Sequence, residues 1–203
     1  MPAIETLFVT KLYRAALEEA PALNAALLQA CRAIAADDGA GQAWSKAHGY
    51  RGYTSYGSLN DLPIRDPHFA ALKKALDRHA SVFAKALHFD LGGRKLKLDS
   101  LWINVLEPGG VHTGHIHPHC ALSGTYYVDV PKGASALKLE DPRHAMMMAA
   151  PPRAEDAPMA ERSFVYIAPQ AGEVLMWESF VRHEVPANSA KKARVSVSFN
   201  YNW

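Results

Sequence analysis

The sequence predicts an α+β fold, with a helical part over residues 1–93 and a β-rich part over residues 94–203. Before residue 93, apolar residues recur at intervals of three and four, which is typical of helices that bury one face. After it, short β-branched and aromatic runs are separated by Gly and Pro, which indicates a sandwich or barrel. We expect one domain, because 203 residues suffice for one sizeable core.

Two helices are expected in the first part. The first follows Pro21, and we expect Gly39 in "DDGAG" to cap its C-terminal end. The second begins with Asp66 as N-cap and Pro67 at the first helical position. Between them, "GYRGYTSYGSLNDL" predicts a loop with a short strand. The buried face of the first helix carries Leu23, Leu27, Cys31 and Ile34.

Six strands are expected in the second part, each with alternating or β-branched residues. They cover residues 95–106, 123–131, 135–143, 164–169, 172–179 and 193–203. Residues 149–163, "AAPPRAEDAPMAERS", are polar, Pro-rich and without periodicity. A long loop of this kind inside a compact fold is often functional, so we expect a lid there.

Composition and charge exclude several classes of protein. The 22 Lys and Arg nearly balance the 20 Asp and Glu, so the charge favours no nucleic-acid or membrane-surface partner. No apolar run reaches the length of a membrane span, and the first residues do not resemble a signal peptide. Cys31 and Cys120 lie far apart, which fits a reducing compartment. We therefore expect a cytoplasmic protein.

Histidines crowd one short segment, where four of the ten lie within residues 112–119. His115 and His117 are two apart, so on one strand both side chains would point to the same side and could reach one metal ion. His183 follows a distant predicted strand. A third imidazole there would complete one face of an octahedron and leave other positions open.

Arg194 and Ser196 lie on one face of the last predicted strand. An arginine that points into a barrel is costly to bury unless it pairs with an anion. A carboxylate fits the guanidinium fork, and the serine hydroxyl would be a second donor. The pattern H-x-H, then His, then R-x-S therefore predicts a metal next to an anion site.

This pattern resembles the superfamily of 2-oxoglutarate and Fe(II)-dependent oxygenases. It is most similar to a group of such oxygenases from bacteria and phages that carries H-x-H-P in place of H-x-D. The resemblance covers about residues 98–203. It rests on "WINVLEPGGVHTGHIHP", "LSGTYYVDVP", "LEDPR", "PQAGEVLMWESFVRHEVPAN" and "ARVSVSFN".

The resemblance implies a double-stranded β-helix, or jelly roll, with the N-terminal helices packed on one side. It implies that His115 and His183 are the two histidines of an iron triad. It also implies that Arg194, helped by Ser196, holds the distal carboxylate of 2-oxoglutarate. Fe(II) and 2-oxoglutarate are thus the expected cofactor and co-substrate.

Two further co-substrate contacts are expected. An Asn eleven residues before the first histidine hydrogen-bonds 2-oxoglutarate in the DNA-repair branch of the superfamily, and Asn104 has this spacing. Tyr126 and Tyr127 are adjacent on a strand, so one of them must face inward. Tyr127 is our candidate for that position, although packing in the core explains either tyrosine equally well.

The sequence departs from the usual superfamily pattern at His117, where most members have Asp or Glu. A third neutral imidazole leaves the full charge of the metal, which favours an anionic co-substrate and lets zinc or nickel compete. Asp129 and Glu184 lack the spacing of a third ligand. We expect His112 and His119 beside the site or at the surface, not as ligands.

The resemblance implies a dioxygenase of the hydroxylase type that acts on an unidentified small molecule or peptide. One alternative is a cupin-type three-histidine metalloprotein, an isomerase or an oxygenase without 2-oxoglutarate. Gly109 fits the start of its first motif, but the expected Glu is absent, and Gly172 lies too far before His183. A non-catalytic sensor is another alternative. The oligomeric state stays open, with a homodimer paired through edge strands as one option.

Overall fold

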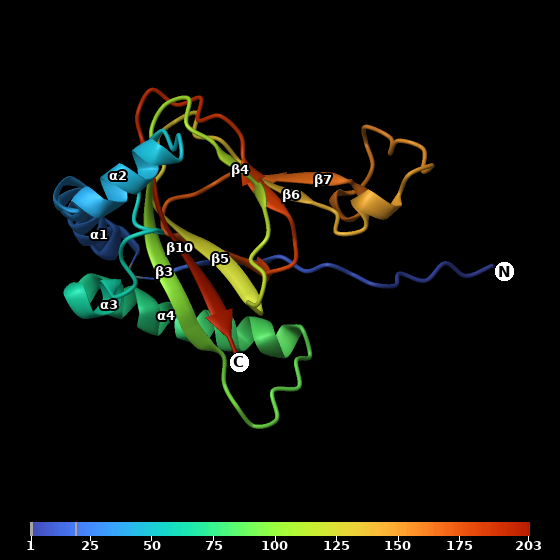
Figure 1. The fold of residues 1–203 in the computed structure, drawn as a ribbon. Coiled ribbons are helices and arrows are strands. Elements are labelled where there is room, and N and C mark those ends of the chain that lie inside the picture. The colour runs from blue at the N-terminus through green and yellow to red at the C-terminus, as the bar shows by residue number, and fades with distance from the viewer. Residues whose placement is uncertain (1, 19) are drawn as a thin grey trace.

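The computed structural model describes residues 2–18 and 20–203, which form two antiparallel sheets with helices on one side (Figure 1). The large sheet has the strand order β1-β8-β5-β10-β3-β2, and the small sheet has the order β4-β9-β6-β7. This is the predicted double-stranded β-helix. The strands are β1 (Tyr13–Ala16), β2 (Gly52–Thr54), β3 (Lys97–Leu106), β4 (His112–His115), β5 (Leu122–Asp129), β6 (Leu137–Glu140), β7 (Phe164–Ile167), β8 (Glu173–Glu178), β9 (His183–Val185) and β10 (Arg194–Asn202).

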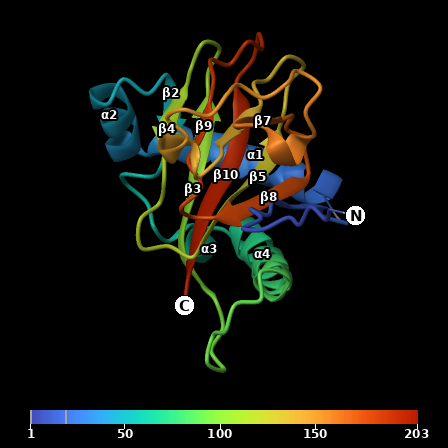
Figure 2. The ribbon, with the colours of Figure 1, turned by 90° about the vertical axis from the view of Figure 1, so that its right-hand side faces the viewer.

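The helices gather on the side of the large sheet away from the small sheet (Figures 1 and 2). They are α1 (Ala20–Asp37), α2 (Gly39–Ala47), α3 (Leu62–Arg65) and α4 (Pro67–Ala86). Asp66 caps α4 as predicted, because its carboxylate accepts a hydrogen bond from the His68 N–H. The prediction for Gly39 was wrong. The Asp38 carboxylate accepts the Gly41 N–H, which starts a new helix at Gly39.

All six predicted strands are present, with shorter bounds, as β3, β5, β6, β7, β8 and β10. The predicted short strand between the helices is β2. The sequence missed β1, which lies in the part expected to be helical and pairs with β8 at the edge of the large sheet. A strand of four residues is too short for its alternation to stand out from the helical pattern around it.

Two apolar layers fix the position of the large sheet. One lies between the helices and the sheet, and it includes Leu27, Phe69, Phe83, Val197 and Phe199. The other lies between the two sheets, and it includes Leu106, Tyr127, Leu137, Trp177 and Val185. Strand β10 supplies Val195, Val197, Phe199 and Tyr201 to the first layer, and its alternate residues point to the opposite face of the sheet. Its polar row therefore points away from the helices.

Residues 141–163 connect β6 to β7 and project from the body of the protein (Figure 1). The connection holds only two short 3₁₀ turns, η1 (His144–Met146) and η2 (Met159–Glu161). None of its residues lines the cavity described below. A lid function for residues 149–163 therefore stays a prediction. Among residues 2–18 and 20–203, no helix has the length and apolar character that a membrane crossing needs.

Candidate active site

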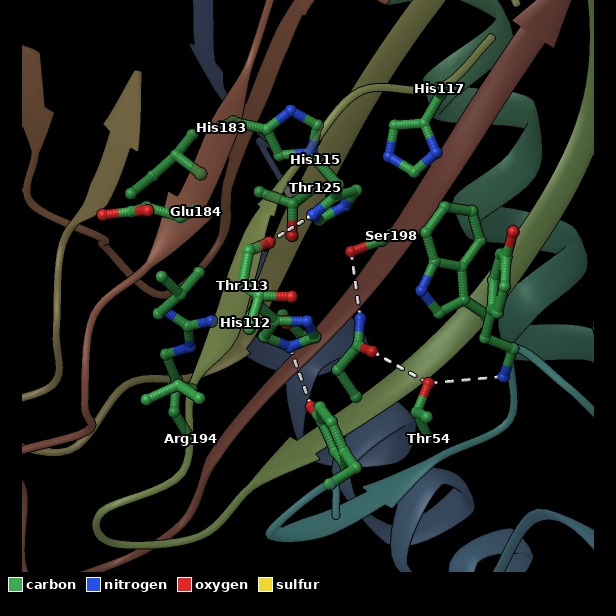
Figure 3. Close-up of a pocket in the computed structure, with 18 of the residues that line it drawn as sticks. Thr54, His112, Thr113, His115, His117, Thr125, His183, Glu184, Arg194 and Ser198 are labelled. Carbon is green, nitrogen blue, oxygen red and sulfur yellow. Dashed lines mark hydrogen bonds between the residues drawn. The ribbon is translucent and has the colours of Figure 1, made fainter. Parts of the chain in front are cut away.

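His115, His117 and His183 converge at one end of the space between the sheets (Figure 3). Each offers one ring nitrogen, and these three atoms lie within 4.8 Å of one another. His115 ends β4 and His183 begins β9, and the two are register partners. The three histidines predicted from the sequence thus meet at one point.

The expectation that His115 and His117 share one strand was wrong. Strand β4 ends at His115, and the N–H of His117 donates to the carbonyl of Ser179, 3.1 Å away, instead of to β9. Pro118 follows His117 and has no N–H to continue a ladder, so the strand cannot extend there. His117 still turns toward the other two rings, whose centroids are 5.0 and 5.2 Å from its own.

Backbone carbonyls orient two of the three rings. The Nδ1 of His115 lies 2.7 Å from the carbonyl of Thr113, and the Nδ1 of His183 lies 3.0 Å from that of Val181. A carbonyl can only accept, so each Nδ1 carries the proton and each Nε2 keeps a free lone pair. This is the tautomer that presents Nε2 to a metal.

Burial keeps two of these imidazoles neutral. Desolvation, with a smaller effect of His115, lowers the pKa of His183 to about 3 and that of His117 to about 4. Neutral rings offer lone pairs at ordinary pH. Neither carboxylate near the site completes the set, because Glu184 pairs with Lys138 at 2.8 Å and Asp129 lies outside the cavity lining.

A cavity of about 560 Å³ extends from the histidines to Arg194 (Figure 3). Arg194 is only 3% exposed, and its Nη1 donates to the carbonyl of Ser135 at 3.1 Å. None of the ion pairs found in the described part of the chain includes Arg194. A buried cation without an anion is costly, so this guanidinium is suited to an anionic ligand in the cavity.

Two buried side-chain polar atoms in the described ranges lack a hydrogen-bond partner, namely Arg194 Nε and Trp177 Nε1. Both residues line the same cavity. An unpaired buried donor costs about 1–3 kcal/mol. Both orphaned donors therefore belong to residues that surround this one space.

The other predicted co-substrate residues form one row across three strands. Ser196 on β10 is the register partner of Asn104 on β3 and of Tyr127 on β5. All three line the cavity, and the Arg194 guanidinium lies 5.6 Å from the centroid of the Tyr127 ring. Tyr126 points the other way, and its hydroxyl donates to Asn24 of α1 at 2.6 Å.

Asn104 is less free than the sequence suggested. Its Oδ1 accepts from the Thr54 hydroxyl, and its Nδ2 donates to Ser198 Oγ, both at 3.0 Å. These contacts use part of the hydrogen-bonding capacity of the amide, although Oδ1 keeps a second lone pair and Nδ2 keeps a second hydrogen. Asn104 therefore shapes the wall of the cavity whether or not it also meets a ligand.

His112 lines the cavity but lies outside the group of three candidate ligands. Its Nε2 lies 2.8 Å from the hydroxyl of Tyr50. Burial, with a smaller effect of Arg194, lowers its pKa to about 3. His119 is exposed, has a φ of 70°, and does not line the cavity.

The sequence did not single out several cavity residues. Alternation could have found Thr125, Ser198 and Trp102, which lie two positions from Tyr127, Ser196 and Asn104 on the same faces. Other cavity residues are brought to it only by the tertiary fold. They are Trp44, Tyr50, Thr54, Tyr56 and Trp177.

Aromatic side chains form the mouth beside His117. Tyr56 packs edge-on against Trp102, with ring centroids 5.2 Å apart, and Trp102 lies 5.8 Å from His117. A second hollow shares Tyr56, Trp102, Ile116 and His117 with the first cavity. His117 therefore borders both spaces.

Comparison with known proteins agrees with this geometry. The model of a family described as "Putative 2OG-Fe(II) oxygenase" matches residues 100–200. No curated protein sequence gives a significant match. The matched segment contains all three converging histidines and Arg194.

Solved structures with the same fold share little sequence with this chain. The α-ketoglutarate-dependent epimerase SnoN from nogalamycin biosynthesis is 18% identical, with a TM-score of 0.63 over 94% of this chain and 76% of its own. A prolyl-4-hydroxylase of Pseudomonas putida is 15% identical, with a TM-score of 0.57 over 95% and 92%. HygX of Streptomyces hygroscopicus, solved with nickel and 2-oxoglutarate, is 13% identical, with a TM-score of 0.59 over 96% and 82%. Since the family match covers the site and the fold agrees, this chain belongs to the 2OG-Fe(II) oxygenase family.

Proposed function

We propose that this chain binds Fe(II) through His115, His117 and His183 and binds 2-oxoglutarate through Arg194, to oxidise an organic substrate. One observation carries the proposal. A buried guanidinium without an ion-pair partner among the described residues lies in the same cavity as three converging imidazoles. Members of the family use iron and 2-oxoglutarate.

The three residues fit a divalent transition metal. Imidazole nitrogens suit iron, zinc and nickel, and three of them leave coordination positions open. No carboxylate joins the three histidines as a ligand group within residues 2–18 and 20–203. The metal would therefore keep its full charge, and a doubly charged co-substrate would offset it.

When bound, iron and 2-oxoglutarate supply an oxidation that is coupled to loss of carbon dioxide from the co-substrate. The residues of the chain itself would hold the co-substrate in place within the cavity. Arg194 and the Ser196 hydroxyl would hold the far carboxylate, and the Tyr127 ring would pack beside it. Arg194 is buried, and the low polarity around a buried guanidinium would strengthen its pairing with a carboxylate.

The hollow that Tyr56 and Trp102 line would admit the substrate. It adjoins His117, so a molecule held there would lie near the metal. Ring faces favour an apolar or planar group at this point. The substrate itself stays unidentified.

The test is an anaerobic titration of the Fe(II)-loaded protein with 2-oxoglutarate, with Arg194→Gln as the matched variant. We expect a visible charge-transfer band in the wild type, and succinate after oxygen is added. The variant should need far more 2-oxoglutarate for the same band. If neither band nor succinate forms, the proposal is wrong, and a three-histidine metalloprotein independent of 2-oxoglutarate is favoured.

A further inference from the structure

The ring of His117 is oriented differently from the other two. His115 and His183 each direct Nδ1 at the backbone carbonyl two residues earlier in the chain. His117 has no such contact, and its Nδ1 instead lies 3.5 Å from the side-chain Nδ2 of Asn200. A group other than the local backbone must therefore hold this ring.

Asn200 is itself held in place. It lies on β10 and is 4% exposed. Its amide is hydrogen-bonded to Ser123 Oγ at 2.8 Å and to Ser100 Oγ at 3.2 Å. Ser123 Oγ lies 2.7 Å from Ser179 Oγ, and we call these four residues the Asn200 network.

The Asn200 network holds His117 at two points. The backbone carbonyl of Ser179 accepts the His117 N–H, and the Asn200 amide faces the His117 ring. The contacts with Asn200 and Ser179 bridge 83 and 62 positions of the chain. The network therefore replaces the strand pairing that His117 lacks.

We propose that Asn200 is the positioning residue for His117, accepting the Nδ1–H through its amide oxygen when Nε2 binds the metal. The proposal rests on the proposed metal site. An imidazole that binds a metal through Nε2 carries its proton on Nδ1, and this proton needs an acceptor. A carboxylate ligand at the same position would carry no such proton.

The amide can present its oxygen without disturbing the network. A 180° turn about the last side-chain bond exchanges Oδ1 and Nδ2 at nearly the same positions. Hydroxyls both donate and accept, so Asn200 Nδ2 would then donate to Ser123 Oγ, and Ser123 to Ser179. Ser100 would donate to Oδ1. Every member of the Asn200 network keeps its partner in this arrangement.

The experiment uses Co(II) alone as the probe and proton NMR as the readout. We expect three exchangeable, strongly shifted ring N–H signals in wild type, one from each ligand. In Asn200→Ala, one signal should broaden beyond detection, because its proton exchanges with solvent, while two signals remain. The dissociation constant for Co(II) should rise about 10–100-fold. Asn200→Asp, which keeps an acceptor, should restore the third signal.

Controls separate positioning from a general loss of structure. Asn202→Ala alters the same strand, where the Asn202 side chain donates to Asp99 at the surface, and should leave all three signals and the affinity unchanged. In a His117→Asp background, Asn200→Ala should lower Co(II) affinity much less than it does alone, because the carboxylate has no N–H that needs an acceptor. This second comparison tests the proposal even if Asn200→Ala is unstable alone.

The proposal is overturned if Asn200→Ala keeps three signals and wild-type affinity, or if the wild type shows fewer than three. It is also overturned if Asn200→Ala lowers Co(II) affinity as much in the His117→Asp background as it does alone. Because neither 2-oxoglutarate nor turnover is involved, the proposed function can fail in its own titration while this result stands.

Discussion

His115 and His183 are register partners on the antiparallel strands β4 and β9, and their ring centroids lie 4.4 Å apart. Backbone pairing, not a mobile loop, thus sets the distance between two of the three candidate ligands. Carbonyls within the same two segments then fix their rings. Such preorganisation lowers the entropic cost of ordering ligands when a metal binds.

We expect His117→Ala to remove most iron binding. The variant leaves two imidazoles, and loss of a direct ligand should raise the dissociation constant for Fe(II) more than about 100-fold, beyond the effect of an indirect contact. Anaerobic equilibrium titration measures it. His119→Ala is the control, because His119 is exposed. Unchanged iron binding in His117→Ala would point to another third ligand.

Arg194→Gln should weaken 2-oxoglutarate binding without weakening metal binding. Truncating one partner of a buried charge pair costs at least about 2 kcal/mol, or about 30-fold in the dissociation constant. Titration of the Ni(II)-loaded protein with 2-oxoglutarate measures the change. Arg143→Gln is the control, because Arg143 is exposed and pairs with Asp141. Equal affinity in Arg194→Gln and wild type would place the anion elsewhere.

Gly124→Ala should destabilise the large sheet. A Cβ there would meet the Leu175 carbonyl oxygen at 2.5 Å and the Phe199 ring. A backbone atom of the neighbouring strand cannot move aside cheaply, so we expect a loss of about 1–3 kcal/mol in the free energy of unfolding. Urea denaturation measures it. Gly39→Ala is the control, because no atom lies within 4 Å of its added Cβ. Equal stability of both variants would contradict the packing described for β5.

The Asp38 carboxyl should make stability depend on acid pH. Burial alone would raise its pKa, but hydrogen bonds from Ser58, Gly41 and Tyr53 outweigh burial and lower the pKa below 3.8. The ionised form is thus favoured in the folded state. Its contribution is present above the unfolded pKa and is lost as pH falls through the folded one.

Asp38→Ala should therefore cost about 1–2 kcal/mol at neutral pH, as expected for a lost helix cap. Denaturation between pH 6 and about 3 should show a smaller loss of stability on acidification for Asp38→Ala than for wild type. Asp37→Ala, at the exposed neighbouring position, should behave as wild type. Parallel pH profiles for wild type and Asp38→Ala would refute this role.

Local periodicity was enough for some of the site. Arg194 and Ser196 are two apart on one strand, so their shared face follows from the sequence. The choice between Tyr126 and Tyr127 did not follow, because both sides of β5 are buried. Only the packing of α1, whose Asn24 meets the Tyr126 hydroxyl, decided which ring faces the cavity.

Residue type and short-range spacing were enough to predict the α+β class, the six main strands and the three histidines. That His117 lies beyond the end of β4, that Asn200 faces its ring, and that His112 contacts Tyr50 became visible only in the three-dimensional fold. Those contacts join residues more than sixty positions apart. Chain separation of that size leaves no periodic signal, since strand register and helix packing alone bring such side chains together.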